Sequence, residues 1–243
     1  MADKRDQLYM EQLNSVESFQ FDHRVAAVFE DMIARSVPGY GLLLDMIRVI
    51  TGEYAQPGTR CYDLGCSLGA STLSIRRGLR FDSGEIIAVD NSPDMVEKCL
   101  QNVSSEPSQI PTHVLCQDIL DTGFDNASII VMNFSLQFIQ TEERMNLLER
   151  IAGGLVSNGV LVLSEKIKVD HSVEQKVLTA LHHGFKRDKG YSDLEIAQKR
   201  TALEQVLVPD RIDEHHERLI AAGFREAWTW FQCFNFASIL AIK

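Results

Sequence analysis

The stretch Asp63-Leu64-Gly65-Cys66-Ser67-Leu68-Gly69 decides the fold of this 243-residue chain. It begins within the apolar run 61–64, a predicted buried strand, and it ends just before a predicted helix that starts near Ser71. Gly65 and Gly69 let the backbone turn tightly between the two elements and approach a ligand closely. A strand, a glycine turn and a helix in this order indicate an open sheet that binds a ligand at the carboxyl ends of its strands.

Four further apolar runs are typical of buried strands and lie at residues 86–89, 112–116, 128–132 and 160–164. Helical patterns separate most of these runs. Strands that alternate with helices pair in parallel and carry helices on both faces of the sheet. The sequence therefore predicts a doubly wound α/β fold with a mostly parallel sheet.

Helical periodicity also flanks this central part of the chain, at residues 22–35, 42–53, 173–186, 193–208 and 212–222. Aromatic and β-branched residues between 224 and 242 predict an antiparallel C-terminal hairpin. Because no repeat, low-complexity tract or linker interrupts the pattern, we expect residues 21–243 to form a single domain, with the extra helices covering the sheet. Residues 1–20 match no motif and are predicted to be a flexible segment.

The formal net charge is −10, with 34 acidic and 24 basic residues. This charge repels a polyphosphate chain, so direct binding of nucleic acid is not expected. The same field repels a small anionic substrate, which would need a local cluster of Arg or Lys. The chain shows neither an apolar run of roughly 20 residues that could cross a bilayer nor a secretory signal, so a cytoplasmic protein is expected.

The five cysteines are odd in number and form no C-x-x-C pair, so we expect free thiols. A zinc site requires closely spaced pairs of Cys or His ligands. The two His-His pairs at 182–183 and 215–216 have no such partners, and no metal is predicted.

Polar residues follow the predicted strands at the points where an open parallel sheet binds ligands. Asp90 and Asn91 follow the second strand, Asp118 follows the third and Asn133 follows the fourth. Each of them alone is explained equally well by turn chemistry. Together with the glycine turn they mark four successive strand ends, which favours a binding site. A carboxylate about 20 residues beyond a glycine turn is placed to accept hydrogen bonds from ribose hydroxyls.

A nicotinamide dinucleotide is the alternative ligand for such a turn. Its fingerprint G-x-G-x-x-G would need glycine at positions 65, 67 and 70, where this chain has Gly65, Ser67 and Ala70. A side chain at position 67 obstructs the closest approach of the pyrophosphate. The spacing D-x-G-x-x-x-G therefore favours a nucleoside without phosphates.

From about residue 21 to residue 243 the sequence resembles the class I S-adenosylmethionine-dependent methyltransferases and, more narrowly, the carboxy-S-adenosyl-L-methionine synthase family. Several long segments agree in order, which makes the resemblance specific. The segments are Arg35-Ser36-Val37-Pro38-Gly39-Tyr40, Tyr62-Asp63-Leu64-Gly65-Cys66-Ser67, Asp90-Asn91-Ser92, Leu163-Ser164-Glu165-Lys166, Gly190-Tyr191-Ser192, Gln198-Lys199-Arg200 and Trp230-Phe231-Gln232-Cys233-Phe234-Asn235-Phe236.

The resemblance implies roles for ten residues. Tyr40 and Arg200 would be the catalytic residues and would contact the carboxyl groups of the bound sulfonium compound. The methionine part would be lined by Gly65, Cys66 and Ser67. Ribose and adenine would be held by Asp90 and Asn91, the adenine edge by Asp118 with Ile119, and the end of the fourth strand would contribute Asn133.

The resemblance also implies an activity, the synthesis of carboxy-S-adenosyl-L-methionine and phenylpyruvate from S-adenosyl-L-methionine and prephenate. The product would supply a partner enzyme that carboxymethylates the wobble uridine of tRNA, and a homodimer with shared sites is expected. Two alternatives stay open. One is a conventional S-adenosylmethionine-dependent methyltransferase that acts on a small molecule or on tRNA, and the other is a non-catalytic S-adenosylmethionine-binding module.

Arg200 also stands out without the family. Residues 192–195 have the form of a capping box, and counting onward from it places Arg200 on an apolar stripe with Ile196, Leu203 and Leu207. A guanidinium there needs an anion or a route to solvent, and its two-pronged geometry suits a carboxylate. The alternatives are an internal ion pair and a dimer contact.

The remaining charged candidates have ordinary explanations. Lys199, four residues after Glu195, is predicted to form an exposed pair with it. Arg76 and Arg77 could supply the local positive charge that an anionic second substrate needs for binding, although a solvated helix face explains them equally well. His182 borders an apolar stripe, so packing is favoured over acid–base chemistry.

Overall fold

The computed structural model describes residues 5–243, which form a seven-stranded sheet of order β3-β2-β1-β4-β5-β7-β6. Strands β1 to β5 pair in parallel, whereas β7 pairs antiparallel with both β5 and β6. The strands are β1 (Arg60–Leu64), β2 (Glu85–Asp90), β3 (Thr112–Cys116), β4 (Ala127–Asn133), β5 (Leu155–Lys166), β6 (Glu226–Cys233) and β7 (Phe236–Ile242). The predicted α/β fold with a C-terminal hairpin is confirmed.

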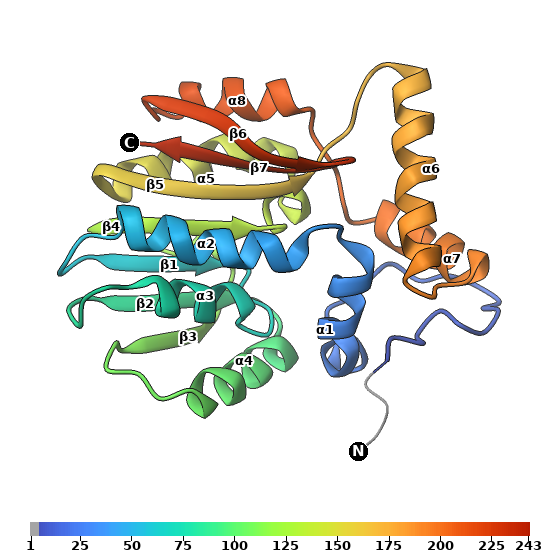
Figure 1. Ribbon diagram of the computed structural model, residues 1–243, viewed down its shortest axis with the longest axis horizontal. Coiled ribbons are helices and arrows are strands. Elements are labelled where there is room, and N and C mark those ends of the chain that lie inside the picture. Colours follow the sequence, from blue (N-terminus) through green and yellow to red (C-terminus); the bar gives the residue numbers. More distant parts are fainter. Residues whose placement is uncertain (1–4) are drawn as a thin grey trace.

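Helices lie in three groups around this sheet (Figure 1). One face is covered by α2 (Tyr40–Tyr54), α3 (Ala70–Gly78) and α4 (Pro93–Ser105), and the other by α5 (Thr141–Gly154) and α8 (Ile212–Ala221). The third group stands beyond the carboxyl ends of the parallel strands and consists of α1 (His23–Ser36), α6 (Ser172–Asp188) and α7 (Asp193–Glu204). Two short 3-10 helices, η1 (Ile119–Asp121) and η2 (Leu136–Phe138), follow β3 and β4.

Alternation along the strands explains why both faces are covered. Ile129 and Val131 of β4 pack under α2 and α3, whereas Ile130 and Met132 of the same strand pack under α5 and α8. All four side chains are fully buried. Burying an aliphatic side chain of this size stabilises the fold by about 1.5–3 kcal/mol, so both helical layers contribute to the free energy of folding.

Two predicted boundaries were wrong. Helix α7 ends at Glu204 rather than at residue 208, because the N–H of Val208 donates to the carbonyl of Gln137 (3.0 Å) and Pro209 follows. Strand β5 begins at Leu155 rather than at residue 160, since the chain enters it directly from the last residue of α5.

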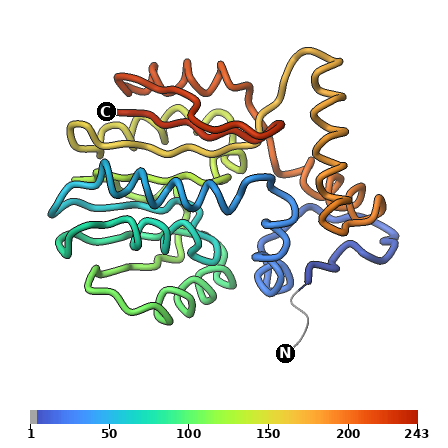
Figure 2. Tube along the Cα trace, viewed as in Figure 1, coloured from blue at the N-terminus to red at the C-terminus, as the bar shows by residue number. Residues whose placement is uncertain are grey.

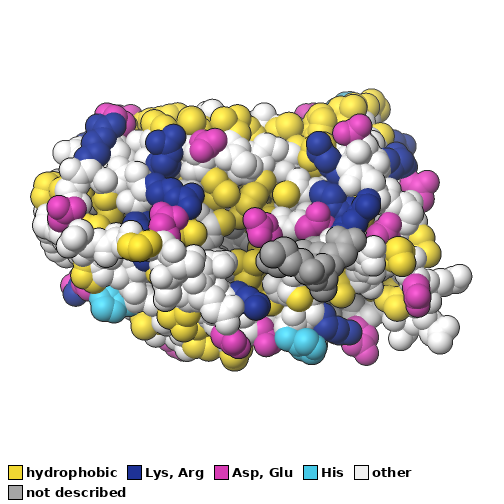
Figure 3. Space-filling model, turned by 60° about the horizontal axis from the view of Figure 1, so that its bottom comes forward, with side chains coloured by type: hydrophobic (Ala, Val, Ile, Leu, Met, Phe, Trp, Pro, Cys, Tyr) yellow, Lys and Arg dark blue, Asp and Glu magenta, His cyan; other side chains and the backbone are white. Residues whose placement is uncertain are grey.

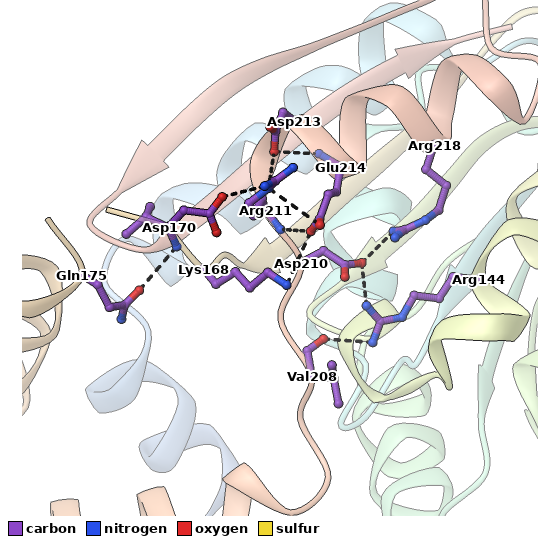
Figure 4. Close-up of polar contacts among 11 residues, drawn as sticks. Arg144, Lys168, Asp170, Gln175, Val208, Asp210, Arg211, Asp213, Glu214 and Arg218 are labelled. Carbon is purple, nitrogen blue, oxygen red and sulfur yellow. Dashed lines mark hydrogen bonds and ion pairs between the residues drawn. The ribbon is translucent and has the colours of Figure 1, made fainter. Parts of the chain in front are cut away.

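Ion pairs fix the position of α6 and α7 at the strand ends (Figure 4). Asp210 accepts hydrogen bonds from Arg144 (2.6 Å) and Arg218 (2.7 Å), and the Arg144 side chain is fully buried. The backbone N–H of Lys168 donates to the Asp210 carbonyl (3.0 Å). The chain that leaves the sheet toward α6 is therefore tied to the chain that returns from α7.

The N-terminal segment 5–20 crosses the outer side of α7 (Figure 2). The Gln198 side chain accepts from the N–H of Leu13 (2.8 Å) and donates to the carbonyls of Tyr9 (3.0 Å) and Glu11 (2.8 Å). Of the predicted flexible segment 1–20, residues 1–4 lie outside the described residues, and the flexibility of the rest stays a prediction. Within residues 5–243, no helix has the length and apolar character that crossing a membrane requires.

Replacing Gly65 by Ala is expected to lower the free energy of unfolding by about 2–4 kcal/mol. Gly65 has a φ of 82°, and an added Cβ would lie 2.6 Å from the Cβ of Ser135. The matched control is Gly153→Ala in α5, where an added Cβ meets nothing within 4 Å. Urea unfolding should show the control unchanged or more stable by up to about 1 kcal/mol. Equal stability of the two variants would contradict this account.

Candidate active site at the carboxyl edge of the sheet

A cavity of about 770 Å³ lies at the carboxyl ends of the parallel strands, where residues of α1, α6 and α7 form its outer wall. All ten residues that the sequence and the resemblance singled out line it. They are Tyr40, Gly65, Cys66, Ser67, Asp90, Asn91, Asp118, Ile119, Asn133 and Arg200. The fold thus brings together residues that lie up to 160 positions apart in the chain.

Asp90 ties the first two strand ends together. Its Oδ2 accepts a hydrogen bond from the N–H of Ser67 in the glycine turn (2.9 Å), and its Oδ1 accepts from the N–H of Ser92 (2.9 Å). Ser67 adopts a left-handed conformation with a φ of 49°, which this hydrogen bond helps to hold. Burial raises the pKa of Asp90, yet a carboxylate has about four acceptor positions and keeps some of them for a ligand.

At the carboxyl end of β3, the side chain of an Asp likewise accepts a backbone hydrogen bond. Asp118 Oδ1 accepts from the N–H of Leu120 (2.8 Å) and so begins η1, which brings Ile119 to the cavity wall. An Asp at this position therefore has a capping role as well as a place in the wall.

Two buried acceptors at the neighbouring strand ends lack partners among the described residues, namely Asn133 Oδ1 and Asp63 Oδ1. The other atoms of both side chains are occupied, because Asn133 Nδ2 donates to Ser71 Oγ (3.1 Å) and Asp63 Oδ2 accepts from Thr72 Oγ1 (2.6 Å). Burial raises the pKa of Asp63 to about 7. An unpaired buried acceptor costs free energy, and Asn133 lines the cavity, so a ligand with N–H or ammonium donors fits its Oδ1.

Tyr40 is the first residue of α2 and enters the cavity wall from the Pro-Gly turn. Gly39 there has a φ of 81°, and an added Cβ would lie 2.6 Å from Phe231 Cζ. Burial raises the pKa of Tyr40, so the side chain is a neutral phenol and is able to donate a hydrogen bond.

The predicted exposed pair between Lys199 and Glu195 was wrong. Glu195 is committed to the capping box, in which its Oε2 accepts from the N–H of Ser192 (2.7 Å). Lys199 is buried, and its Nζ lies 3.4 Å from Asp6 Oδ2 and 3.0 Å from Ser36 Oγ. Helical spacing could not reveal this contact, because Asp6 comes from the N-terminal segment.

Arg200 lines the cavity, but its side chain is 57% exposed, and its Nε lies 2.5 Å from Glu204 Oε1. Only part of the predicted stripe holds, since Ile196 is buried while Leu207 lies beyond the end of the helix. An exposed i,i+4 pair contributes only about 0.3–0.5 kcal/mol. Arg200 can therefore exchange Glu204 for a ligand carboxylate at little cost.

Arg76 and Arg77 do not supply charge to this cavity. Arg76 donates to the carbonyls of Val103 (2.9 Å) and Glu106 (2.8 Å), and Arg77 pairs with the Glu106 carboxylate. Both arginines fasten α3 to the end of α4, and the hypothesis that they serve a second substrate was wrong.

Beside Arg200, the cavity is lined by three lysines to which the sequence analysis gave no role in the site, namely Lys166, Lys186 and Lys199. Lys166 is the last residue of β5. Its position after the fifth apolar run matches that of the polar residues after the first four, and this is the sequence signal that marks it. Lys186 lies one helical turn after His182 on α6, a position that spacing alone does not mark as special.

His182 is buried and lies against the ring of Phe236, with 4.9 Å between the ring centroids. Its Nε2 lies 2.8 Å from the carbonyl of Ser36 and must carry the proton, since a carbonyl only accepts. Burial and the nearby Lys186 lower the pKa of His182 to about 3. These contacts agree with the packing interpretation, because such an imidazole is a weak base at neutral pH.

Cys61, Cys66, Cys99, Cys116 and Cys233 are all free thiols. Among residues 5–243, no three His, Cys, Asp or Glu side chains are grouped so that they could hold a metal ion.

Comparison with known proteins places these observations in a family. The family model described as a methyltransferase domain matches residues 62–159. The chain is 57% identical to the carboxy-S-adenosyl-L-methionine synthase of Hahella chejuensis, with both chains covered in full. It is 52% identical to the synthase of the same name from Trichlorobacter lovleyi, again with both covered in full. The synthase of Marinobacter nauticus is 51% identical over 98% of this chain and 95% of its own length.

Solved structures show the same fold at low sequence identity. Magnesium protoporphyrin IX methyltransferase from Synechocystis, with bound SAH, matches with a TM-score of 0.61 at 16% identity and covers 87% of each chain. A putative O-methyltransferase from Nostoc punctiforme matches with a TM-score of 0.62 at 16% identity. The match covers 91% of this chain but 59% of that one.

Replacing Lys186 by Met is expected to stabilise the chain at acidic and neutral pH, by on the order of 2–4 kcal/mol. Burial, together with Lys199 and Lys166, lowers the pKa of Lys186 from 10.5 to about 7. Between these values the unfolded chain binds one more proton than the folded chain, so wild-type stability rises with pH. Below the folded pKa both states are charged, and the folded state bears the full cost of the buried ammonium.

Urea unfolding at about pH 6 and about pH 9.5 measures this difference. The gain from Lys186→Met should shrink at the higher pH. Lys176→Met, at an exposed position of the same helix, serves as the control and should show no such dependence. An equal gain at both pH values would show that Lys186 is not a buried ammonium with a lowered pKa.

Proposed function

The chain belongs to the carboxy-S-adenosyl-L-methionine synthase family, and we propose that it is the enzyme that forms carboxy-S-adenosyl-L-methionine from S-adenosyl-L-methionine and prephenate. The observation that carries the proposal is the gathering of all ten expected residues around one cavity in a chain that matches these synthases over its full length. Phenylpyruvate would be the second product.

The proposed reaction is balanced without an external oxidant or reductant. Prephenate loses its ring carboxylate as carbon dioxide and its ring hydroxyl as hydroxide, which leaves phenylpyruvate. The methyl group beside the sulfonium of S-adenosyl-L-methionine loses a proton and forms a carbon–carbon bond to the carbon dioxide. The proton and the hydroxide combine to water. No external base is required, because the first step releases one.

The residues at the strand ends would hold S-adenosyl-L-methionine as a substrate. Gly65, Cys66 and Ser67 would line its methionine part, and the unpaired acceptor Asn133 Oδ1 in the cavity wall suits its ammonium group. Because S-adenosyl-L-methionine has no phosphates, the side chain of Ser67 at the turn is tolerated.

The adenosine part would lie along the next two strand ends. Asp90 and Asn91 would bind ribose and adenine, and Asp118 with Ile119 would contact the adenine edge. This assignment uses the acceptor capacity that the two carboxylates keep after binding Ser67, Ser92 and Leu120.

The protein would contribute mainly position, charge and exclusion of water. A carbanion beside a sulfonium is stable only where water cannot protonate it. Aromatic side chains supply much of the cavity wall, namely Phe19, Phe21, Phe29, Phe134, Phe138 and Phe236. Tyr40 and Arg200 would contact carboxyl groups of the substrate and of the product.

The cellular setting follows from the family and is proposed with it. The product would supply carboxymethyl groups to a separate enzyme that modifies the wobble uridine of tRNA, and we place the protein in the cytoplasm as a homodimer. Residues 21–243 would act as a single catalytic domain. On the face shown in Figure 3, Lys and Arg side chains stand beside Asp and Glu side chains, which agrees with a protein that does not bind RNA directly.

A conventional methyltransferase is the second candidate, favoured by the match of residues 62–159 to the methyltransferase domain model. Mass spectrometry of the ligand retained on the purified protein separates the two, followed by an assay with S-adenosyl-L-methionine and prephenate. Formation of carboxy-S-adenosyl-L-methionine that depends on prephenate is expected. Methylation of an acceptor without prephenate would support the second candidate, and binding without turnover would indicate a non-catalytic module.

Arg200→Ala is expected to lower the kcat/KM for product formation at least tenfold, while the affinity for S-adenosyl-L-methionine changes less. A charged hydrogen bond to a substrate carboxylate contributes roughly 1.5–3 kcal/mol. Arg225→Ala, at an exposed position outside the cavity, is the control. Steady-state kinetics and isothermal titration provide the two readouts, and unchanged turnover in Arg200→Ala would remove Arg200 from the site.

A further inference from the structure

Four positively charged side chains line the same cavity, namely Lys166, Lys186, Lys199 and Arg200. Two of them have acid partners, since Lys199 pairs with Asp6 and Arg200 pairs with Glu204. Within residues 5–243, the ammonium groups of Lys166 and Lys186 form no ion pair and no hydrogen bond. The wall also contains the carboxylates Asp90 and Asp118, but these lie at the strand ends, and neither forms an ion pair with Lys166 or Lys186.

These charges act on one another. Burial lowers the pKa of both Lys166 and Lys186. Lys199 and Lys166 lower the pKa of Lys186 further, whereas at Lys166 the lowering by Arg200 is opposed by Glu204. Lys186 is only 6% exposed, so water screens little of this repulsion. Lysines without acid partners are notable in a chain whose net charge is −10.

A buried ammonium without a partner costs several kcal/mol of folding free energy. Lys186 is such a group, and Lys166 is half-buried beside the same cavity. An anion that enters the cavity best explains the two lysines, since it would offset both the desolvation and the mutual repulsion. The rings of Phe134 and Phe236 line the same cavity, and His182, which packs on Phe236, is neutral. The wall thus suits a small organic anion with an apolar body.

We propose that Lys166 and Lys186 form an anion subsite that binds a carboxylate of the second substrate, a small organic dianion whose apolar body lies against Phe134 and Phe236. Arg200 would take the other carboxylate in exchange for Glu204. The identity of the second substrate rests on the proposed function. The anion subsite itself rests only on the cavity and its unpaired lysines.

Malonate, a simple dicarboxylate, tests the subsite without turnover. Thermal unfolding is followed in malonate and in sodium chloride of equal ionic strength. Malonate should raise the Tm of the wild type more than the chloride does, and Lys186→Met and Lys166→Met/Lys186→Met should lose most of this shift. Lys186→Met removes a buried unpaired charge and should fold. Lys176→Met is the matched control and should respond as the wild type does.

Isothermal titration with prephenate, in the presence of S-adenosyl-L-homocysteine, which lacks the reacting methyl group, gives a second readout without turnover. Lys186→Met should bind prephenate at least tenfold more weakly, while its affinity for S-adenosyl-L-methionine stays within about twofold of wild type. Lys186→Arg, which keeps the positive charge, should recover part of the loss. In steady-state assays the KM for prephenate should rise more than kcat falls.

The outcomes separate this proposal from the proposed function. A malonate shift that depends on Lys186, in a protein that forms no carboxy-S-adenosyl-L-methionine, would support the subsite and reject the synthase activity. Wild-type responses to malonate and to prephenate in the double variant would overturn the subsite, even if the synthase activity were observed.

Discussion

Parallel pairing is the constraint on which the site depends. Because β1 to β5 run in the same direction, their carboxyl ends meet at one edge of the sheet, and residues distant in the chain become neighbours there. The Asp90 carboxylate then connects two of these ends, with one oxygen on the Ser67 amide and the other on the Ser92 amide. The turn after β1 is thus held open toward the cavity by a residue of β2.

The outer wall depends on a second set of contacts, which the sheet does not supply. Helices α6 and α7 reach beyond the strand ends, and the buried Asp210 with Arg144 and Arg218 fixes where the chain leaves and re-enters the main body. Removing one partner from a buried ion pair costs about 3–5 kcal/mol, so this anchor is strong enough to hold the wall. The Asp6–Lys199 pair fastens the N-terminal segment to the same wall.

The sequence pattern predicted the parts of the structure that interactions between nearby residues determine. Hydrophobic periodicity and the turn and capping residues located the strands, the capping box of Ser192 and Glu195, and the strand ends from Gly65 to Asn133. Each of these features is set by residues close in sequence. Lys199 was misplaced since its partner Asp6 lies 193 residues away. Arg200 was predicted from the resemblance and from the helical stripe, whereas its pairing with Glu204 became visible only in the structure.

The distribution of charge links stability to function in this fold. An acidic chain repels anions at long range, so an anionic substrate must gain its binding energy inside the cavity. Placing ammonium groups there without acid partners weakens the folded state, because the lysines repel one another and lose hydration. Pairing them with internal acids would relieve that cost but would cancel the charge that a substrate needs. The protein with an anion in the cavity is therefore expected to have a higher free energy of unfolding than the free protein. The unpaired lysines lower the stability of the free protein but raise its affinity for the anion.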